Sequence, residues 1–315
     1  MKTIQLSKIS LAMALGITIL VSCGKDDDAP TVITLPPIGG YANAGEVGAA
    51  DLLAYWPLDG NGTESKSNTA PATAVGASYE AGAKGQGLKL VDGYLDYPTI
   101  PALSASPNSI TISVWAKLFN TKLNPTADSH ISEIFNISGA TPGNGYVSVL
   151  AETHRLVTHD TIQVKGRYET TYNNAQSNGD IVNQTKMEPW MISDNAIATN
   201  IIKHVAFPNK IGGKWAHIVY VFDGSAAKNM IYVNGVNISN SPWVLRNGGI
   251  TPFNLTYAST THPIIGARSN FIAGLATGDV WNKAMTGGVD EIRVWKKALS
   301  GPDINFLYEL EKAGR

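Results

Sequence analysis

The sequence predicts an all-β protein, an antiparallel sandwich of two sheets, from three local patterns. Ser109 to Phe119 alternates between two kinds of side chain, with the period of two that a β-strand requires. Trp215 to Phe222 is apolar on both faces, as expected of a central sandwich strand. Asn234 and Gly235 separate two apolar runs, and this pair favours a hairpin turn because both turn positions need a positive φ.

One helix is predicted, at the C-terminal end of the chain. Ser300 can cap it, because Asp303 follows three residues later and Pro302 is tolerated in a first turn. Ile304 and Leu307 then recur at helical spacing, so this helix should pack on the sandwich. Shorter strands are predicted at Leu52–Leu58, Gly87–Val91, Tyr94–Tyr97, Ile131–Ile137, Tyr146–Leu150, Thr161–Lys165, Pro263–Ala267 and Gly288–Trp295.

The N-terminal segment has the pattern of a secretory signal. Two lysines precede Ile9–Val21, an apolar stretch that is short for a membrane span of about 20 residues. Leu20–Cys23 resembles a bacterial lipobox, which implies that residues 1–22 are removed and that the Cys23 sulfur is lipidated. Cys23 is the only cysteine, so it cannot form a disulfide within the chain. An ordinary secretory signal that contains a cysteine is the alternative.

A tether is expected after the lipidated cysteine. Gly24–Asp28 is acidic and resembles the segment that sends lipoproteins of glycan-foraging Gram-negative bacteria to the outer face of the outer membrane. The alternative is that the lipoprotein stays on the periplasmic side of the membrane. Ala29 to about Ala49 is rich in proline and glycine and poor in large apolar residues, which predicts a flexible stalk. Residues 23–50 are therefore assigned to the lipidated cysteine and stalk, and residues 51–315 to one globular domain.

The overall composition gives no electrostatic reason to expect nucleic-acid binding. The net charge is −1, and only 16% of the residues are charged. Proteins that bind nucleic acid through its phosphates usually carry a marked excess of basic residues. The balance of charges gives no reason to expect binding to an acidic membrane surface either.

Several segments in order resemble the laminin-G-like domain, a concanavalin A-like jelly roll, in its pentraxin-type bacterial form. This resemblance implies an antiparallel β-sandwich over nearly the whole globular part, closed by a short C-terminal helix. The fold also occurs in enzymes, so it does not by itself decide the function. The segments that carry the resemblance are Leu53–Gly62, Gly85–Tyr97, Ser109–Lys117, Lys214–Tyr220, Tyr232–Gly235, Gly266 and Gly287–Trp295.

The same resemblance implies a structural calcium ion where the first and last strands meet. The matching oxygen ligands are Asp290, Glu64, Asp59 and Asn68. Glu64 stands where the family usually has aspartate, and the positive charge of Lys66 would weaken a cation site. The alternative is that these acidic residues cap turns and accept hydrogen bonds from backbone N–H groups.

Catalytic patterns are weak. A glycosidase needs two carboxylates across one sugar bond, and the Glu-x-Asp-x-x-Glu pattern of hydrolases with this fold is absent. Asp290 and Glu291 are adjacent and so point to opposite faces of a strand. No Gly-x-Ser-x-Gly nucleophile motif occurs. A lyase that uses His154, His159 and neighbouring tyrosines and arginines stays open as an alternative.

The candidate ligand-binding residues are aromatic. An insertion at about residues 168–208 is polar and rich in turns, and loops of this length within a domain are usually functional or disordered. It contains Tyr168, Tyr172 and Trp190, whose ring faces could stack on a sugar. The alternative is that these rings anchor the insertion to the sandwich. Trp243 and Trp281 are further candidate platforms.

Together these features predict a lipid-anchored protein of the outer membrane, displayed on the cell surface, that captures a glycan without catalysis. Neighbouring glycan-uptake proteins are further expected partners. A glycoside hydrolase or polysaccharide lyase with unrecognised catalytic residues is the second class of function. An adhesin that binds protein is the third.

Overall fold

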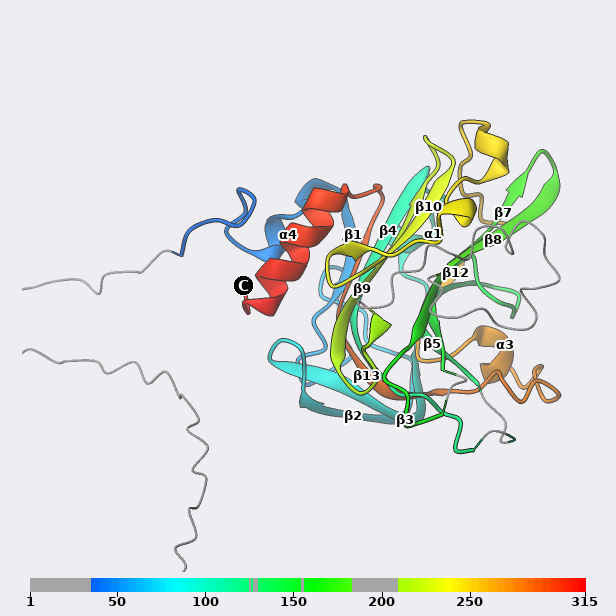
Figure 1. Ribbon diagram of the computed structural model, residues 1–315. Coiled ribbons are helices and arrows are strands. Elements are labelled where there is room, and N and C mark those ends of the chain that lie inside the picture. Colours follow the sequence, from blue (N-terminus) through cyan, green and yellow to red (C-terminus); the bar gives the residue numbers. More distant parts are fainter. Residues whose placement is uncertain (1–34, 125, 127–129, 154–155, 183–208) are drawn as a thin grey trace, which may run out of the picture. The chain divides into compact units, whose positions relative to one another are not determined.

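The structure, a computed structural model, describes residues 35–124, 126, 130–153, 156–182 and 209–315. Its compact unit runs from Pro36 to Arg315. Thirteen strands in these described residues pair antiparallel and form one sheet, which curls until its two halves face each other (Figure 1). The predicted all-β sandwich is confirmed, and its two layers are joined by an unbroken ladder of hydrogen bonds.

The strand order places the two ends of the sheet in different layers. Eleven of the described strands follow one another in a single row, called here the main path, and two further strands pair beside it. These two are β1 (Leu52–Trp56), which pairs with β13 (Met285–Trp295), and β2 (Thr73–Ala81), which pairs with β3 (Gln86–Asp96). The longer helical segments are α1 (Pro101–Ser104), α3 (Ser269–Ile272) and α4 (Gly301–Lys312). The main path is β11 (Val236–Asn237), β10 (Lys228–Val233), β9 (Trp215–Asp223), β4 (Ser109–Leu118), β13 (Met285–Trp295), β3 (Gln86–Asp96), β12 (Thr261–Ile265), β5 (Ile131–Gly139), β6 (Val147–Glu152), β7 (Gln163–Tyr172) and β8 (Ala175–Val182).

The main core fills the space between the two halves of the sheet. The alternation predicted for β4 is confirmed, because Ile110, Ile112 and Val114 all point into this core. Gly166 of β7 faces the ring of Tyr220 of β9, and a Cβ at Gly166 would lie 2.0 Å from that ring. Only glycine leaves room for this contact, which holds β7 against β9 across the core.

A second core lies between α4 and the other face of β9. Val219 and Val221 alternate with the residues that enter the main core, and they pack with Ile304 of α4. The helix begins as predicted: the Ser300 hydroxyl accepts a hydrogen bond from the Asp303 backbone N–H at 3.2 Å. The order of layers is therefore α4, the β9 layer, the main core and the β7 layer.

Part of the predicted stalk belongs to the globular unit. Residues 36–50, called here the N-terminal strap, pack on α4 and β13. The Tyr41 hydroxyl donates to the Asp303 carboxylate at 2.9 Å, and the Trp295 indole donates to the Val47 carbonyl at 3.0 Å. The domain therefore begins before the predicted boundary, because a few apolar side chains inside a segment rich in proline and glycine are enough to dock it.

The first part of the predicted insertion is regular structure. Residues 168–182 form the end of β7 and all of β8, joined by a tight turn in which Asn173 and Asn174 have positive φ. Asparagine tolerates that backbone conformation better than most residues, so the pair suits a hairpin turn. Residues 183–208, the rest of the insertion, lie outside the described residues.

Candidate functional site

Strand β7 has two chemically different faces. Val164 and Tyr168 point into the main core, whereas Lys165, Arg167 and Glu169 alternate with them on the outer face. Hydrogen-bonded strands fix this alternation, because successive side chains point to opposite sides. Charged side chains are thus presented in a row on the layer farthest from α4.

Strand β8 adds to the same outer face through its register with β7. Val182 lies opposite Lys165, Asp180 lies opposite Arg167, and Asn178 lies opposite Glu169. Residues directly opposite each other in an antiparallel pair share one face of the sheet. The hairpin therefore assembles a polar surface out of two segments that are each only half polar in sequence.

A short loop after β10 and β11 supplies an aromatic ring and a guanidinium group. Trp243 ends the 3-10 turn η5 (Ser241–Trp243), and Arg246 follows three residues later. Backbone hydrogen bonds tie this loop to its neighbours: the Asn240 N–H donates to the Val182 carbonyl at 2.9 Å, and the Arg246 N–H to the Ala227 carbonyl at 2.7 Å. The ring and the guanidinium are therefore held at the end of β8.

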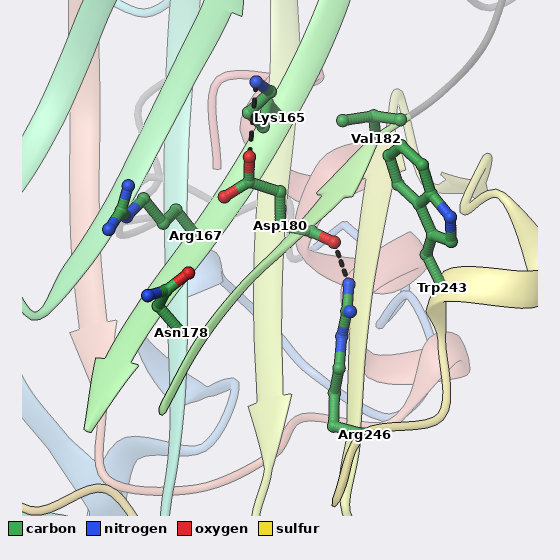
Figure 2. A pocket seen from close by; sticks show the side chains of 7 residues that line it. All are labelled: Lys165, Arg167, Asn178, Asp180, Val182, Trp243 and Arg246. Atoms are coloured by element: carbon green, nitrogen blue, oxygen red, sulfur yellow. Dashed lines mark hydrogen bonds and ion pairs between the residues drawn. The ribbon is translucent and has the colours of Figure 1, made fainter. Parts of the chain in front are cut away.

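These elements enclose a pocket of about 330 Å³, called here the Trp243 pocket (Figure 2). This volume is at the small end of the range of about 300–1,000 Å³ for ligand sites. Figure 2 shows the indole of Trp243 on one side, with the charged groups across the floor. The pocket is lined by Lys165, Arg167, Asn178, Asp180, Val182, Trp243 and Arg246.

A second pocket adjoins the first and has a volume of about 290 Å³. It is called here the Trp281 pocket. The two pockets share Lys165, Arg167 and Asp180, which are called the shared floor. Trp281 is 38% exposed, and the Arg268 guanidinium lies 5.3 Å from its ring centroid. The other lining residues of this pocket are Ile131, Glu152, Arg268 and Trp281.

The shared floor is held by ion pairs. The Lys165 ammonium group lies 2.7 Å from a Glu152 carboxylate oxygen and 3.3 Å from an Asp180 oxygen. Burial opposes the charge on Lys165, but the two carboxylates outweigh it and raise the pKa of the amine above its ordinary value. Arg167 pairs with Glu169 at 2.8 Å. The side chains of the floor are therefore fixed in place before any ligand arrives.

This arrangement suits recognition of a ligand. Glu152 and Asp180 are the two carboxylates among the lining residues of the pockets, and both contact the same ammonium group of Lys165. Ion pairs of this kind hold charged groups in fixed positions from which they can accept hydrogen bonds from a ligand.

Of the predicted aromatic platforms, the structure brings Trp243 and Trp281 into the paired pockets. Tyr168 is only 2% exposed and packs edge-on against Phe253, so it is part of the core and offers no free ring face. Tyr172 also packs on Phe253, with a ring-centroid distance of 5.2 Å. The prediction that these tyrosines anchor the segment is the one that agrees with the structure. Trp190 and Cys23 lie outside the described residues.

The predicted calcium ligands are hydrogen-bonded to the chain itself. The buried Glu64 carboxylate accepts bonds from the N–H groups of Tyr55 at 2.7 Å and Lys66 at 3.0 Å, and it also accepts bonds from Ser67. One Asp290 oxygen accepts from the N–H groups of Ala83 and Lys84, and the other accepts from Glu291. Hydrogen bonds of this kind are what the alternative predicted, in which the acidic residues cap turns.

The remaining candidates do not complete a calcium site. Asp59 accepts from the Gln86 N–H at 2.8 Å, and Asn68 has the positive φ of a turn residue. Among the described residues, no group of three or more acidic, histidine or cysteine side chains is placed to hold a metal ion. Calcium takes six to eight oxygen ligands, which can include carbonyl groups and water, so the calcium site stays a prediction.

A buried Ser–His–Glu cluster under α4 has the composition of a catalytic triad but not its geometry. The Ser113 hydroxyl lies 2.6 Å from Nε2 of His217, and Glu311 lies 3.6 Å from the same nitrogen. A triad needs the carboxylate on the other ring nitrogen. Burial, with a smaller effect of Arg293, lowers the pKa of His217 to about 3. All three side chains are buried, so the cluster anchors α4.

The charged lining residues Glu152, Lys165, Asp180, Arg246 and Arg268 were not predicted from the sequence, and Arg167 was considered only as part of the lyase alternative. On a single strand, alternating charges indicate only a solvated face. The available signal was the alternation of Lys165 and Arg167 with buried residues directly before an Asn–Asn turn. That signal predicts a two-faced hairpin, but only the tertiary structure places Arg246 at its edge.

Comparison with protein families gives one match. The profile of a laminin-G family described as the concanavalin A-like lectin/glucanases superfamily matches residues 92–305. This range contains the lining residues of both pockets, α3 and the first five residues of α4. No curated protein is significantly similar in sequence. Among the described residues, no helix has the length and apolar character needed to cross a membrane.

Solved structures with a similar arrangement of strands are distant in sequence. Domain 4 of an extracellular arabinanase from Geobacillus stearothermophilus, in complex with arabinotriose, is 17% identical and has a TM-score of 0.47; the match covers 82% of this chain and 98% of that one. The binding domain of botulinum neurotoxin DC, in complex with SialylT, is 13% identical with a TM-score of 0.49, covering 84% and 52%. A heptameric SAP-like pentraxin from Limulus polyphemus is 15% identical with a TM-score of 0.36, covering 64% and 69%. Likenesses of this degree say nothing about what the present chain binds.

Proposed function

Because this chain belongs to the concanavalin A-like lectin/glucanases superfamily, we propose that it binds a glycan in the Trp243 and Trp281 pockets without cleaving it. One observation carries the proposal: two tryptophans line adjoining pockets that share a floor of fixed charged groups. Aromatic faces cover the apolar side of a sugar ring, and polar groups fixed beside them can hydrogen-bond to its hydroxyls.

The rigidity of the site supports this proposal. The ion pairs of Lys165 and Arg167 hold the shared floor, and backbone hydrogen bonds hold the loop that carries Trp243. A site whose groups are already ordered loses less entropy when it binds a ligand. The two pockets lie side by side along the sheet, so they suit two or more linked sugar units better than a single monosaccharide.

Binding to a glycan array, followed by calorimetry on the positive glycans, tests the proposal. Trp243→Ala and Trp281→Ala should each weaken binding by about tenfold or more, since each removes a stacking face. Phe119→Ala is the matched control, because Phe119 is an exposed aromatic residue, 44% accessible, that lines neither pocket. Equal affinity of both tryptophan variants and the control would refute the site.

The same glycans distinguish binding from catalysis and from adhesion. Incubation with each bound polysaccharide should release no reducing ends and no unsaturated uronates over hours. A steady increase in either product would replace the binding proposal with the hydrolase or lyase alternative. If no glycan on the array bound and the protein instead bound saturably to a protein matrix, the adhesin function would replace the glycan-binding proposal.

We further propose that Cys23 carries lipid and holds the protein at the cell surface, on the grounds of the Leu20–Cys23 motif and the acidic residues after it. The Cys23→Ser variant should leave the membrane fraction and appear in the soluble fraction. Protease added to intact cells should digest the wild-type protein if it faces outward. Protection from that protease, with digestion only after the outer membrane is opened, would place the protein in the periplasm.

A further inference from the structure

The Trp243 pocket has an uneven charge. Its lining contains three cationic side chains, those of Lys165, Arg167 and Arg246, and one carboxylate, that of Asp180. Lys165 is compensated by Glu152 and Asp180, and Arg167 by Glu169. Arg246 has no carboxylate within ion-pair distance among the described residues. One guanidinium group of the pocket is thus left without an anionic partner.

Arg246 is oriented by the chain around it. Its Nε donates to the Asn229 side-chain oxygen at 2.9 Å, and its Nη2 donates to the backbone oxygen of Asp180. Gly179 lies beneath it, and a Cβ there would come within 3.2 Å of the guanidinium carbon. These contacts use two nitrogens of the guanidinium group, while Nη1 has no hydrogen-bond partner in the part of the chain described. The group therefore keeps donor capacity for a ligand.

Burial of Arg246 has an energetic consequence. The surrounding protein lowers the pKa of this arginine by desolvation, more than the nearby tyrosines and Asp180 compensate. An arginine stays charged in proteins, so the desolvation is a cost that the free protein carries. A ligand anion placed against the guanidinium would offset that cost through charge-assisted hydrogen bonds.

We infer that the Trp243 pocket binds an acidic sugar, with the sugar carboxylate against Arg246 and the sugar ring against Trp243. This inference rests on the proposed function and narrows it to glycans that contain uronic or similar carboxylate-bearing units. The Trp281 pocket has no such uncompensated cation, because its Arg268 pairs with Glu133 at 2.9 Å. A neutral neighbouring unit is therefore compatible with that pocket.

A matched pair of ligands tests the inference on the full chain. Oligogalacturonate and its fully methyl-esterified form share the same sugar backbone, and the ester replaces each carboxylate charge with a small neutral methyl ester. Oligomannuronate and heparosan oligosaccharides extend the panel. At least one free-acid oligosaccharide should bind about 10- to 100-fold more tightly than its methyl ester, the range expected for hydrogen bonds to a charged group. Added salt should weaken that preference.

Variants assign the preference to one residue. Arg246→Gln should lower the affinity for the free acid more than the affinity for the ester, and so remove most of the preference for the free acid, whereas Arg246→Lys should retain part of that preference. Lys214→Gln, which removes an exposed charge outside both pockets, is the control and should retain the full preference. Thermal melting of each variant shows whether it is folded.

The outcomes separate the inference from the proposed function. Equal binding of acid and ester, or a preference that survives in Arg246→Gln, would overturn the acidic-sugar inference and leave glycan binding intact. Binding of sulfated oligosaccharides in preference to all carboxylated ones would also overturn it as stated. Binding of no glycan, charged or neutral, would remove the proposed function and this inference with it.

Discussion

Asp180 lies directly opposite Arg167 in the register of β7 and β8, yet the two side chains pair with other residues. The Asp180 carboxylate reaches Lys165 at 3.3 Å, and the Arg167 guanidinium reaches Glu169 at 2.8 Å. The outer face of the hairpin is therefore a chain of charges along β7, linked to β8 by the Lys165–Asp180 ion pair and by a hydrogen bond from Gln176 to Glu169. Four predictions follow from this and from the other contacts described above.

Lys165 is expected to stabilise the fold as well as the site. Lys165→Met removes the ammonium group that contacts both Glu152 and Asp180, so the free energy of unfolding should fall by about 1–3 kcal/mol near neutral pH. Part of that loss should return in acid, where the carboxylates are protonated. Urea unfolding at two pH values measures both effects. Lys210→Met is the control, because Lys210 and its partner Asp160 are exposed at 3.9 Å. A loss equal to the control's would contradict this reading.

Asp290 is expected to make stability fall as the pH rises. Burial raises the pKa of its carboxyl to about 7 in the folded protein, against about 4 in the unfolded chain. The folded state therefore binds more protons between about pH 4 and pH 7, and the contribution of this group decreases with pH across that window. Asp290→Asn cannot titrate, so its unfolding free energy should change less over the same range. Parallel pH profiles of wild type and variant would contradict the assignment.

Calcium is expected to leave stability unchanged, because the carboxylates predicted to bind it are occupied by backbone N–H groups. The midpoint of thermal unfolding should be the same in millimolar calcium and in chelator. A ligand that binds only the native state raises stability by mass action, so any specific site would be visible in this comparison. Magnesium serves as the control for ionic strength. If calcium but not magnesium raised the midpoint of thermal unfolding, and Asp290→Asn abolished that rise, the protein would contain the predicted calcium site.

The N-terminal strap is expected to be part of the folding unit. A chain that begins at Asp51 lacks the buried Val47 side chain and the hydrogen bonds to Asp303 and Trp295. Its free energy of unfolding should be about 2–4 kcal/mol below that of a chain that begins at Pro36. Chemical unfolding of the two forms makes the comparison. If both unfold at the same denaturant concentration, the strap contributes nothing.

Much of the fold could be predicted because its signals are local. The alternation in β4 holds as expected, and Asn234 and Gly235 adopt the positive φ angles that their hairpin turn requires. Ser300 caps α4, since a cap depends only on neighbours in sequence. Strand β8 was not predicted, because its polar residues have little preference for strand and pair only through the register with β7.

The site could be predicted only in part. A tryptophan beside loop residues is a reasonable binding candidate, so Trp243 and Trp281 were found. Tyr168 looked equally suitable, but its position on the inner face of β7 depends on the register of the whole strand. Arg246 gave no signal, because its lack of an anionic partner is a property of the assembled structure.

The N-terminal strap also decides how the molecule responds to mechanical load. Arg315 donates to the Pro36 carbonyl at 2.9 Å, so the start of the compact unit and its C-terminal residue lie on the α4 side, across the main core from the pockets. A pull applied upstream of Pro36 is therefore borne first by the strap and α4. The contacts between the strap and α4 can break one after another under such a force. The sheet that forms the pockets lies behind them and would keep its shape until they are broken.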